Sequence, residues 1–226
     1  MTDILDRARV ALHLVFASTL ALSLVCSLAI KTGHADVPVA DTADEIQPLT
    51  VGDSAPYFSV RDVNDEVVEF DPAALERPAI LITFRGGWCP YCNLHLSELR
   101  HVLPELAEQD IDVLFLSGDR PDQLVASLKP ETQTDVETLD YTLLSDADAT
   151  AAIALGIAFR APKTTGLKLR AIGKDIDDSS IDRHGVLPVP AVFAIGTNGK
   201  VAFAYTNADY RERLSPDELR SVAEKL

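Results

Sequence analysis

The sequence is poor in basic residues, in cysteine and in aromatic residues, and it has no repeats or low-complexity segments. Lysine and arginine number 20 against 35 aspartate and glutamate residues, so the 226-residue chain has a formal net charge of −15. Phosphate binding needs clustered basic side chains, and this shortage therefore excludes nucleic-acid binding. With 47% hydrophobic residues, the composition is that of a globular protein. We expect one folded domain with an acidic surface.

The first 35 residues differ from the rest of the chain. Val10 to Ile30 contains no formal charge and follows a short segment with two arginines. Such a run is typical of a secretory signal peptide, and small residues precede possible cleavage sites after Ala29 and Ala35. The run is also long enough to serve as an uncleaved membrane anchor. Both alternatives predict export, with the protein periplasmic or membrane-anchored and facing the periplasm.

The remaining sequence predicts a linker followed by a single α/β domain. Residues 36–50 are polar, contain proline and show no periodicity, which indicates a linker. Residues 51–226 alternate apolar runs with helical patterns, which predicts a central mixed β-sheet flanked by helices, parallel early and antiparallel late. The expected strands are 57–61 and 66–70 as an N-terminal β-hairpin, 79–84, 111–117, 141–145, and a late hairpin within 189–207. The expected helices are 90–109, 122–128, 148–155 and one capped by Ser215, with an irregular excursion over 156–186.

A Cys-x-x-Cys pair lies in the stretch FRGGWCPYCN, between an expected buried strand and a helix. Because Cys26 falls in the N-terminal apolar run, Cys89 and Cys92 are the cysteines of the domain. The unpaired N–H groups and positive dipole at a helix N-terminus stabilise a thiolate and lower its pKa. With Pro90 as the first helical residue, we expect Cys89 to be the exposed thiol and Cys92 its buried partner. The pair predicts a redox-active Cys89–Cys92 disulfide.

Three further residues are candidates for supporting roles. Arg85 either adds positive field to the thiols or is a solvated surface arginine. Trp88 is expected to pack beside the thiols. Pro190 stands at the head of a strand, where a cis X-Pro bond is tolerated. Base rates favour a trans bond, but together with the Cys-x-x-Cys pair we expect Pro190 to be cis, to lie against the thiols and to leave no room for a metal.

The chain resembles the thioredoxin-fold suprafamily and, more narrowly, its peroxiredoxin-like branch of alkyl hydroperoxide reductase and thiol-specific antioxidant proteins. The matching stretches are VGDSAPYFSVRDVNDEVV, AILITFRGGWCPYCNLHLSEL, IDVLFLSGD, YTLLSD, LPVPAVFAIGTNGKVAFAY and NADYRERLSPDEL. They cover most of residues 51–226. The resemblance implies a thioredoxin-like fold and an antioxidant thiol oxidoreductase.

The resemblance leaves two registers for the cysteines. In the peroxiredoxin register Cys92 falls at the peroxidatic position, Cys89 replaces a hydroxyl residue and Arg85 replaces a proline. In the thioredoxin register Cys89 attacks and Cys92 resolves. Peroxiredoxins also use an arginine that supports the thiolate, and Arg211 and Arg213 are the candidates for that role.

Three classes of function follow from these patterns. The first is a thiol oxidoreductase without a cofactor, acting on peroxides or on protein disulfides and recycled by a partner dithiol protein. The second is a copper or zinc site formed by Cys89, Cys92 and His95, with His184 as a fourth ligand. We favour the first class, because the sequence has no second Cys-x-x-Cys and structural zinc needs four ligands. The third, a redox-inactive binding protein, ranks last because both thiols are present.

Overall fold

The computed structural model describes residues 38–139 and 142–226. The signal peptide or anchor expected over residues 1–35 and the apolar run with Cys26 lie outside these ranges. Among the residues that are described, no helix has both the length and the apolar character needed to span a bilayer.

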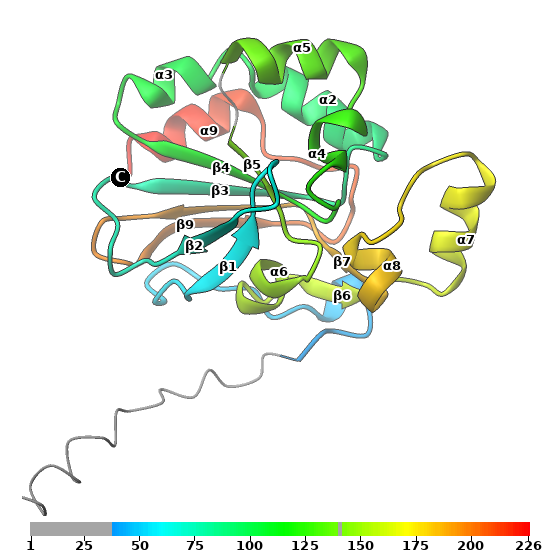
Figure 1. The fold of residues 1–226 in the computed structure, drawn as a ribbon. Helices are drawn as coiled ribbons and strands as arrows, with labels where there is room; N and C mark the ends of the chain where they lie inside the picture. The colour runs from blue at the N-terminus through cyan, green and yellow to red at the C-terminus, as the bar shows by residue number, and fades with distance from the viewer. Residues whose placement is uncertain (1–37, 140–141) are drawn as a thin grey trace, which may run out of the picture. The chain divides into compact units, whose positions relative to one another are not determined.

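A seven-stranded mixed sheet forms the centre of the domain, in the order β2-β1-β5-β4-β3-β8-β9 (Figure 1). β4 pairs in parallel with β3 and β5, whereas β8 is antiparallel to β3 and to β9. The parallel pairing of β3, β4 and β5 and the late antiparallel strands agree with the prediction, while the N-terminal hairpin β1–β2 and its pairing with β5 are antiparallel. The strands are β1 (Phe58–Arg61), β2 (Val67–Phe70), β3 (Ala79–Phe84), β4 (Asp112–Ser117), β5 (Thr142–Ser145), β8 (Ala191–Ile195) and β9 (Val201–Thr206), with β6 (Ala158–Arg160) and β7 (Val186–Pro188) forming a separate two-stranded sheet.

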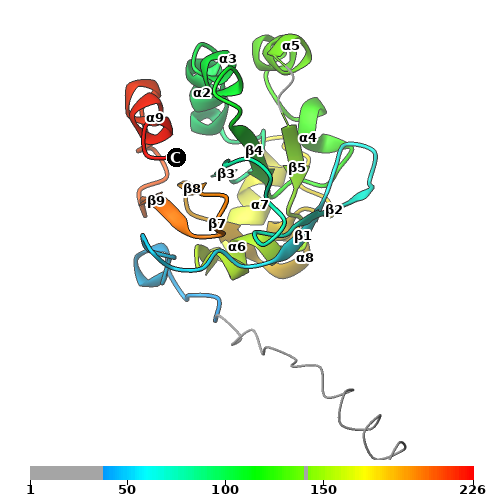
Figure 2. The same cartoon turned by 90° about the vertical axis from the view of Figure 1, so that its left-hand side faces the viewer.

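Helices cover both faces of the central sheet (Figure 2). α2, α3, α5 and α9 lie on one face, while α6 and the β6–β7 sheet lie on the other. The helical segments are η1 (Ala43–Glu45), α2 (Pro90–Leu99), α3 (Leu103–Ala107), α4 (Gln123–Ala126), α5 (Pro130–Leu139), α6 (Thr150–Ala154), α7 (Thr164–Ala171), α8 (Ser180–His184) and α9 (Pro216–Ala223).

β3 lies at the centre of the core and leads directly to the two cysteines. It is flanked by β4 and β8, and all six of its side chains are buried. This is why its sequence, AILITF, is apolar at every position except Thr83 and does not alternate with polar residues. Burial of each large aliphatic side chain contributes about 1.5–3 kcal/mol, so the strand is a rigid base for the loop that follows.

Local sequence signals predicted several elements correctly. The N-terminal hairpin forms with Phe58 opposite Phe70, and their rings stack with centroids 4.8 Å apart. The late hairpin turns at Gly199, which has a positive φ of 70° that glycine adopts without strain. At α9, Ser215 and Glu218 form both hydrogen bonds of a capping box.

The single helix expected over 90–109 is wrong, because the chain forms two helices. α2 ends at Leu99 and α3 begins at Leu103. Pro104 lacks an N–H and its ring would clash with the carbonyl four residues earlier, so it is accommodated only in the first turn of a new helix. α5 was not expected at all.

The linker expected over 36–50 and the irregular excursion expected over 156–186 also need correction. Ala40 pairs with β6, where its N–H donates to the Ala158 carbonyl (3.1 Å) and its carbonyl accepts from the Arg160 N–H (2.8 Å). Residues 38–50 therefore belong to the same folded unit as the rest of the described chain. The excursion contains β6, α7, α8 and β7, all too short for a hydrophobic period to be visible in the sequence.

Candidate active site around the two cysteines

The two cysteines occupy the start of α2, directly after the loop that leaves β3. Cys89 is the N-cap of α2, with extended backbone angles, and Pro90 is the first helical residue. Both cysteines are free thiols. The expectation that Cys89 is exposed is wrong, because its exposed fraction is 2% against 1% for Cys92. The two thiols differ instead in that Cys89 lines a cavity and Cys92 does not.

The environment separates the pKa values of the two thiols. The pKa of Cys89 is lowered to about 6, chiefly by a hydrogen bond from the Cys92 side chain and further by the Cys92 backbone N–H, Arg213 and Arg85, against an opposing effect of burial. The pKa of Cys92 is raised, first by burial and then by its interaction with Cys89. The site therefore stabilises one thiolate, on Cys89, with Cys92 as the protonated partner.

Arg213 is the cation nearest the second sulfur. Its Nη2 lies 3.3 Å from the Cys92 Sγ, and its Nε and Nη1 are buried without a hydrogen-bond partner among the described residues. Arg211, the other candidate, is exposed and pairs with Asp209 at 2.7 Å. Of the two arginines the structure thus brings only Arg213 to the cysteines, across 121 residues of sequence.

Arg85 is also part of the site, and it is not a solvated surface residue. Its guanidinium lies 4.4 Å from the ring centroid of Tyr210 and 5.6 Å from that of Phe159. This half-buried cation–π position keeps the positive charge beside the thiols, where it helps to lower the Cys89 pKa. Burial in turn lowers the pKa of Arg85 itself.

Trp88 belongs to the same buried core cluster as the two cysteines and lines the cavity that Cys89 lines. Its side chain is 9% exposed, and its Nε1 is buried with no hydrogen-bond partner among the described residues. Gly86, two residues before, has a φ of 147°, and a Cβ there would collide with the Trp88 indole and with Asp119. Only glycine leaves room for the indole at this point.

A buried carboxylate, which the sequence did not indicate, fixes the loop before Cys89. Asp119, which follows β4, accepts hydrogen bonds from the Gly87 N–H (2.7 Å) and from the Ser127 hydroxyl (2.8 Å). Burial raises the pKa of Asp119 to about 6. On the other side, the Asn93 amide donates to the Gly87 carbonyl at 2.6 Å. Gly87 is therefore held through both its backbone groups.

We call the space beside Cys89 the thiol cavity. Its volume is about 900 Å³ and its wall is mainly apolar. Its lining comes from the loop before α2 and the start of that helix, from residues 127–130, and from α7 with the residues after it. Phe159, Leu187 and Tyr210 also contribute to the wall. Its basic residues are Arg85, Lys129, Lys168 and Lys174, and its described lining includes no aspartate or glutamate.

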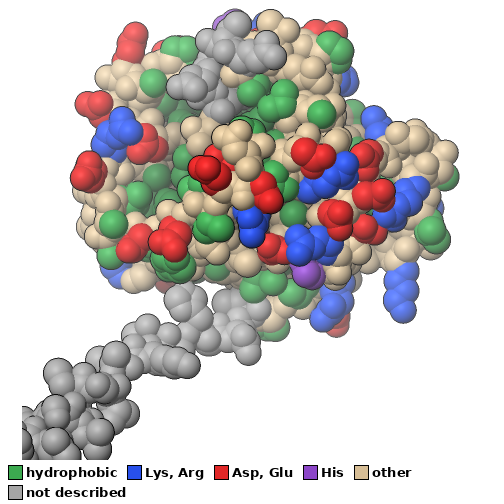
Figure 3. All heavy atoms as spheres, in the orientation of Figure 1, with side chains coloured by type: hydrophobic (Ala, Val, Ile, Leu, Met, Phe, Trp, Pro, Cys, Tyr) green, Lys and Arg blue, Asp and Glu red, His purple; other side chains and the backbone are tan. Residues whose placement is uncertain are grey.

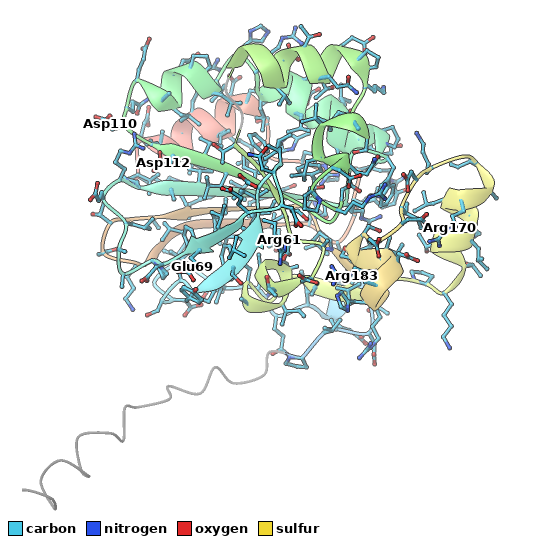
Figure 4. The ribbon with its side chains drawn as sticks, viewed as in Figure 1. Arg61, Glu69, Asp110, Asp112, Arg170 and Arg183 are labelled. Carbon is cyan, nitrogen blue, oxygen red and sulfur yellow. The ribbon has the colours of Figure 1, made fainter. Side chains whose placement is uncertain are left out.

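A second space, the arginine–aspartate cavity, lies beside the N-terminal hairpin. It measures about 650 Å³, and its lining includes Arg61 of β1, Arg183 of α8 and several aspartates. Figure 4 labels Arg61 and Arg183, and Figure 3 shows basic and acidic side chains interspersed on this face of the domain. Neither cysteine lines it.

The cis bond expected at Pro190 is wrong, because every described peptide bond is trans. In this trans form, the backbone carbonyl groups of Val189 and Pro190 both accept hydrogen bonds. The Val189 carbonyl accepts from the Thr83 hydroxyl (3.0 Å), and the Pro190 carbonyl accepts from the Asn207 N–H (3.1 Å). Pro190 is buried at the end of the sheet where β3 leads to the cysteines, but it does not line the thiol cavity beside Cys89.

The hypothesised metal ligands are not brought together. The Nε2 of His95 lies 2.9 Å from the Leu214 carbonyl, which makes it a donor, and burial lowers the His95 pKa to about 4. His184 is exposed and lies near Asp148. In the two described ranges, no three His, Cys, Asp or Glu side chains are placed to hold one ion.

Sequence comparison places these features in a known family. Residues 51–204 match the AhpC/TSA family. The chain belongs to that family. Peroxiredoxin Bcp of Escherichia coli (strain K12) is 32% identical over 103 residues, which are 46% of this chain and 62% of that protein. The alignment thus spans less than two thirds of this relative. The thiol-disulfide oxidoreductase ResA of Bacillus anthracis is 21% identical over 168 residues, 74% of this chain and 76% of ResA.

Solved structures confirm the fold expected of this AhpC/TSA member. Peroxidoxin BcpB from Mycobacterium tuberculosis superimposes with a TM-score of 0.54 at 19% identity, over 78% of this chain and 96% of that one. A putative thioredoxin reductase from Burkholderia cenocepacia gives a TM-score of 0.56 at 16% identity, over 80% and 99%. The mixed sheet flanked by helices is therefore the thioredoxin-like architecture of peroxiredoxins.

Proposed function

We propose that this AhpC/TSA protein is a thiol-dependent peroxidase in which Cys89 attacks the peroxide and Cys92 resolves the product. The observation that carries the proposal is the position of Cys89 in the wall of the thiol cavity. There its thiolate is stabilised by Cys92, Arg213 and Arg85. A pKa of about 6 leaves Cys89 ionised at neutral pH, and the thiolate is the form that reacts.

The reaction balances with two thiols and one peroxide. The Cys89 thiolate attacks one peroxide oxygen, the O–O bond breaks, and the departing alkoxide or hydroxide takes up a proton. Cys89 becomes a sulfenic acid, whose sulfur is then attacked by Cys92 with loss of water. The products are an alcohol or water, a second water and the Cys89–Cys92 disulfide. Two electrons from a dithiol protein return the pair to the reduced state.

The assignment of Cys89 as the attacking thiol departs from the peroxiredoxin register. That register gives the attacking role to Cys92, which also has the contact with Arg213. Cys92, however, does not line the thiol cavity, and burial raises its pKa. Access and ionisation therefore both support Cys89, as in the thioredoxin register.

Stopped-flow oxidation of the reduced protein by hydrogen peroxide and by cumene hydroperoxide tests the proposal. We expect Cys89→Ser to lose the fast phase. Cys92→Ser should keep one rapid turnover and accumulate a sulfenic acid that dimedone traps. The reverse pattern, with only Cys92→Ser inactive, would support the peroxiredoxin register. If the wild type reacts no faster than a free thiol, the peroxidase proposal is wrong.

Thiol–disulfide exchange is a second candidate function. A cavity of about 900 Å³ is far larger than a small peroxide needs, and ResA is a relative across most of the domain. In this reaction Cys89 would form a mixed disulfide with a protein substrate, and Cys92 would release the reduced substrate. Trapping with Cys92→Ser distinguishes the two, because a peroxidase yields a sulfenic acid and an exchange enzyme yields a mixed disulfide.

We also propose that the domain works outside the cytoplasm, as a periplasmic protein or through a membrane tether. The support is the uncharged run from Val10 to Ile30. An exported dithiol pair needs a supply of electrons, so the proposed partner is a recycling dithiol protein on the same side of the membrane.

A further inference from the structure

Part of the thiol cavity is formed by a segment of the sequence that contains basic residues and no acidic ones. Residues 149–174 contain arginines and lysines but no aspartate or glutamate, in a chain with 35 acidic and 20 basic residues. This segment includes α7 and supplies one side of the thiol cavity. In Figure 1, α7 lies at the right-hand edge of the domain, beyond β6 and β7. Such a separation of charge indicates a surface that receives anionic groups.

The lysines of this surface are exposed and uncompensated. Lys129, Lys168 and Lys174 are in no ion pair within the described residues and line the cavity mouth. Arg170, on the same helix as Lys168, differs because it pairs with Asp177 and Asp182 at 2.8 and 2.7 Å. The positive field of the three lysines is therefore available to an external partner.

Large apolar side chains stand exposed among these lysines. Leu167 and Ile172 are each 70% exposed, more than any other large hydrophobic side chain in the described residues, and no residue of α7 is buried. Tyr91 and Tyr210 line the same cavity, 37% and 39% exposed, with their rings edge to face at 5.6 Å. Basic, aliphatic and tyrosine side chains on one surface are the combination found at membrane–water interfaces.

We propose that α7 and the mouth of the thiol cavity dock on the surface of an anionic lipid bilayer. The lysines contact the headgroup phosphates, and Leu167 and Ile172 enter the boundary between headgroups and acyl chains. The run from Val10 to Ile30 favours lipid over an acidic protein as the occupant. Wherever that run is retained, it holds the domain close to a bilayer. The thiol cavity then opens toward the membrane.

Trp88 is a built-in probe for this contact, because it is the single tryptophan of the chain and lines the cavity. The full-length protein is reconstituted into phosphatidylcholine vesicles with or without phosphatidylglycerol. Nitroxide-labelled lipids then quench the Trp88 fluorescence wherever the cavity mouth lies on the bilayer. We expect quenching that depends on phosphatidylglycerol and decreases with added salt.

Charge reversal on α7 and after it tests the surface itself. In Lys168→Glu/Lys174→Glu we expect the docking equilibrium constant to fall by at least about 25-fold, since each lysine lost at an anionic surface changes that constant roughly fivefold. Lys200→Glu/Lys225→Glu makes the same change of net charge elsewhere and should behave as wild type. Ile172→Ser should weaken quenching without changing its salt dependence.

Two results would overturn the proposal. One is equal Trp88 quenching in wild type and in Lys168→Glu/Lys174→Glu. The other is no quenching of wild type in anionic vesicles, which would leave an acidic protein as the partner of this surface. Both readouts are independent of peroxide turnover, so they remain decisive even if the proposed function fails.

Discussion

The thiol cavity and the arginine–aspartate cavity differ in whether their basic side chains are paired with carboxylates. In the arginine–aspartate cavity each arginine has a carboxylate of its own. The pairs are Arg61–Asp65 at 3.1 Å, Arg120–Asp122 at 2.8 Å and Arg183–Asp148 at 2.8 Å. In the thiol cavity Arg85 and three lysines face no acidic side chain of the described lining.

This difference shows when the positive charges of a cavity can act on a thiol or a ligand. Exposed ion pairs cancel locally and contribute little, with a median of about 0–1 kcal/mol. Their field is therefore not available to a thiol or a ligand. Where carboxylates are absent, the field of Arg85 acts on Cys89 and contributes to its lowered pKa. Four predictions test this contrast.

The largest effect is expected from adding a side chain at Gly87, in the closely packed loop before Cys89. A Cβ on Gly87 would lie 2.7 Å from the Ser127 carbonyl carbon and 2.8 Å from the Leu128 nitrogen, so Gly87→Ala must displace backbone. We expect a loss of about 3 kcal/mol in unfolding free energy, measured by urea denaturation. Gly166→Ala in α7, with no neighbour closer than 3.5 Å, is the matched control and should be neutral or slightly stabilising. Equal losses of unfolding free energy in the two variants would show that the backbone around Gly87 is not unusually crowded.

The second prediction uses two buried carboxyl groups, one at each site. Burial raises the pKa of Asp119, beside the thiol loop, and of Asp146, in the arginine–aspartate cavity, to about 6. Between about pH 4 and pH 6 the folded state therefore holds protons that the unfolded state has lost, so stability falls as pH rises.

The corresponding test compares the pH dependence of urea denaturation in single variants. Asp119→Asn and Asp146→Asn should each remove about 3 kcal/mol of this decline. Only Asp119→Asn should also alter thiol reactivity, because Asp119 holds Gly87. Identical thiol kinetics in the two variants would show that the Asp119 carboxylate does not position the loop before Cys89.

The third prediction concerns the arginine that contacts the buried sulfur. Arg213→Met removes a cation that lowers the Cys89 pKa, so that pKa should rise and the reactivity at pH 7 should fall roughly tenfold. Titration of the thiolate by its ultraviolet absorbance measures the shift. Arg183→Met, in the arginine–aspartate cavity, should leave the titration unchanged. An unshifted pKa in Arg213→Met would show that its contact is only structural.

The smallest effect is expected at an ion pair in the arginine–aspartate cavity. Arg61→Ala removes a pair whose side chains are 43% and 68% exposed, and it should change the unfolding free energy by less than about 1 kcal/mol. Thermal or urea denaturation at low and high salt measures this. A larger loss, or a changed Cys89 pKa, would mean that the two cavities are coupled.

Elements with strong local signals were predictable from the sequence. β3 is a nearly continuous apolar run, the late hairpin has Asn-Gly at its turn, and Ser215 with Glu218 marks the start of α9. Each signal lies within a few residues and reflects a requirement of the backbone itself. The position of Cys89 as an N-cap followed from the same kind of reasoning.

The remaining features depend on contacts between distant segments. The Arg213–Cys92 contact spans 121 residues and Asp119 reaches Gly87 across 32, and no spacing in the sequence marks either one. α7 buries none of its residues, so it has no apolar periodicity to detect. Pro190 illustrates the opposite error, since a local motif suggested a cis bond where the surrounding hydrogen bonds are satisfied by the trans form.

The placement of Arg85 and Arg213 has an energetic consequence for the redox cycle. When the two sulfurs join, the negative charge on Cys89 disappears, while both guanidinium groups stay in their half-buried positions near the sulfurs. The oxidised protein thus loses an attraction that the reduced protein has, and uptake of two electrons restores it. A dithiol whose reduced form is selectively stabilised is a strong electron acceptor. We therefore expect the disulfide to be short-lived wherever a more reducing protein is at hand.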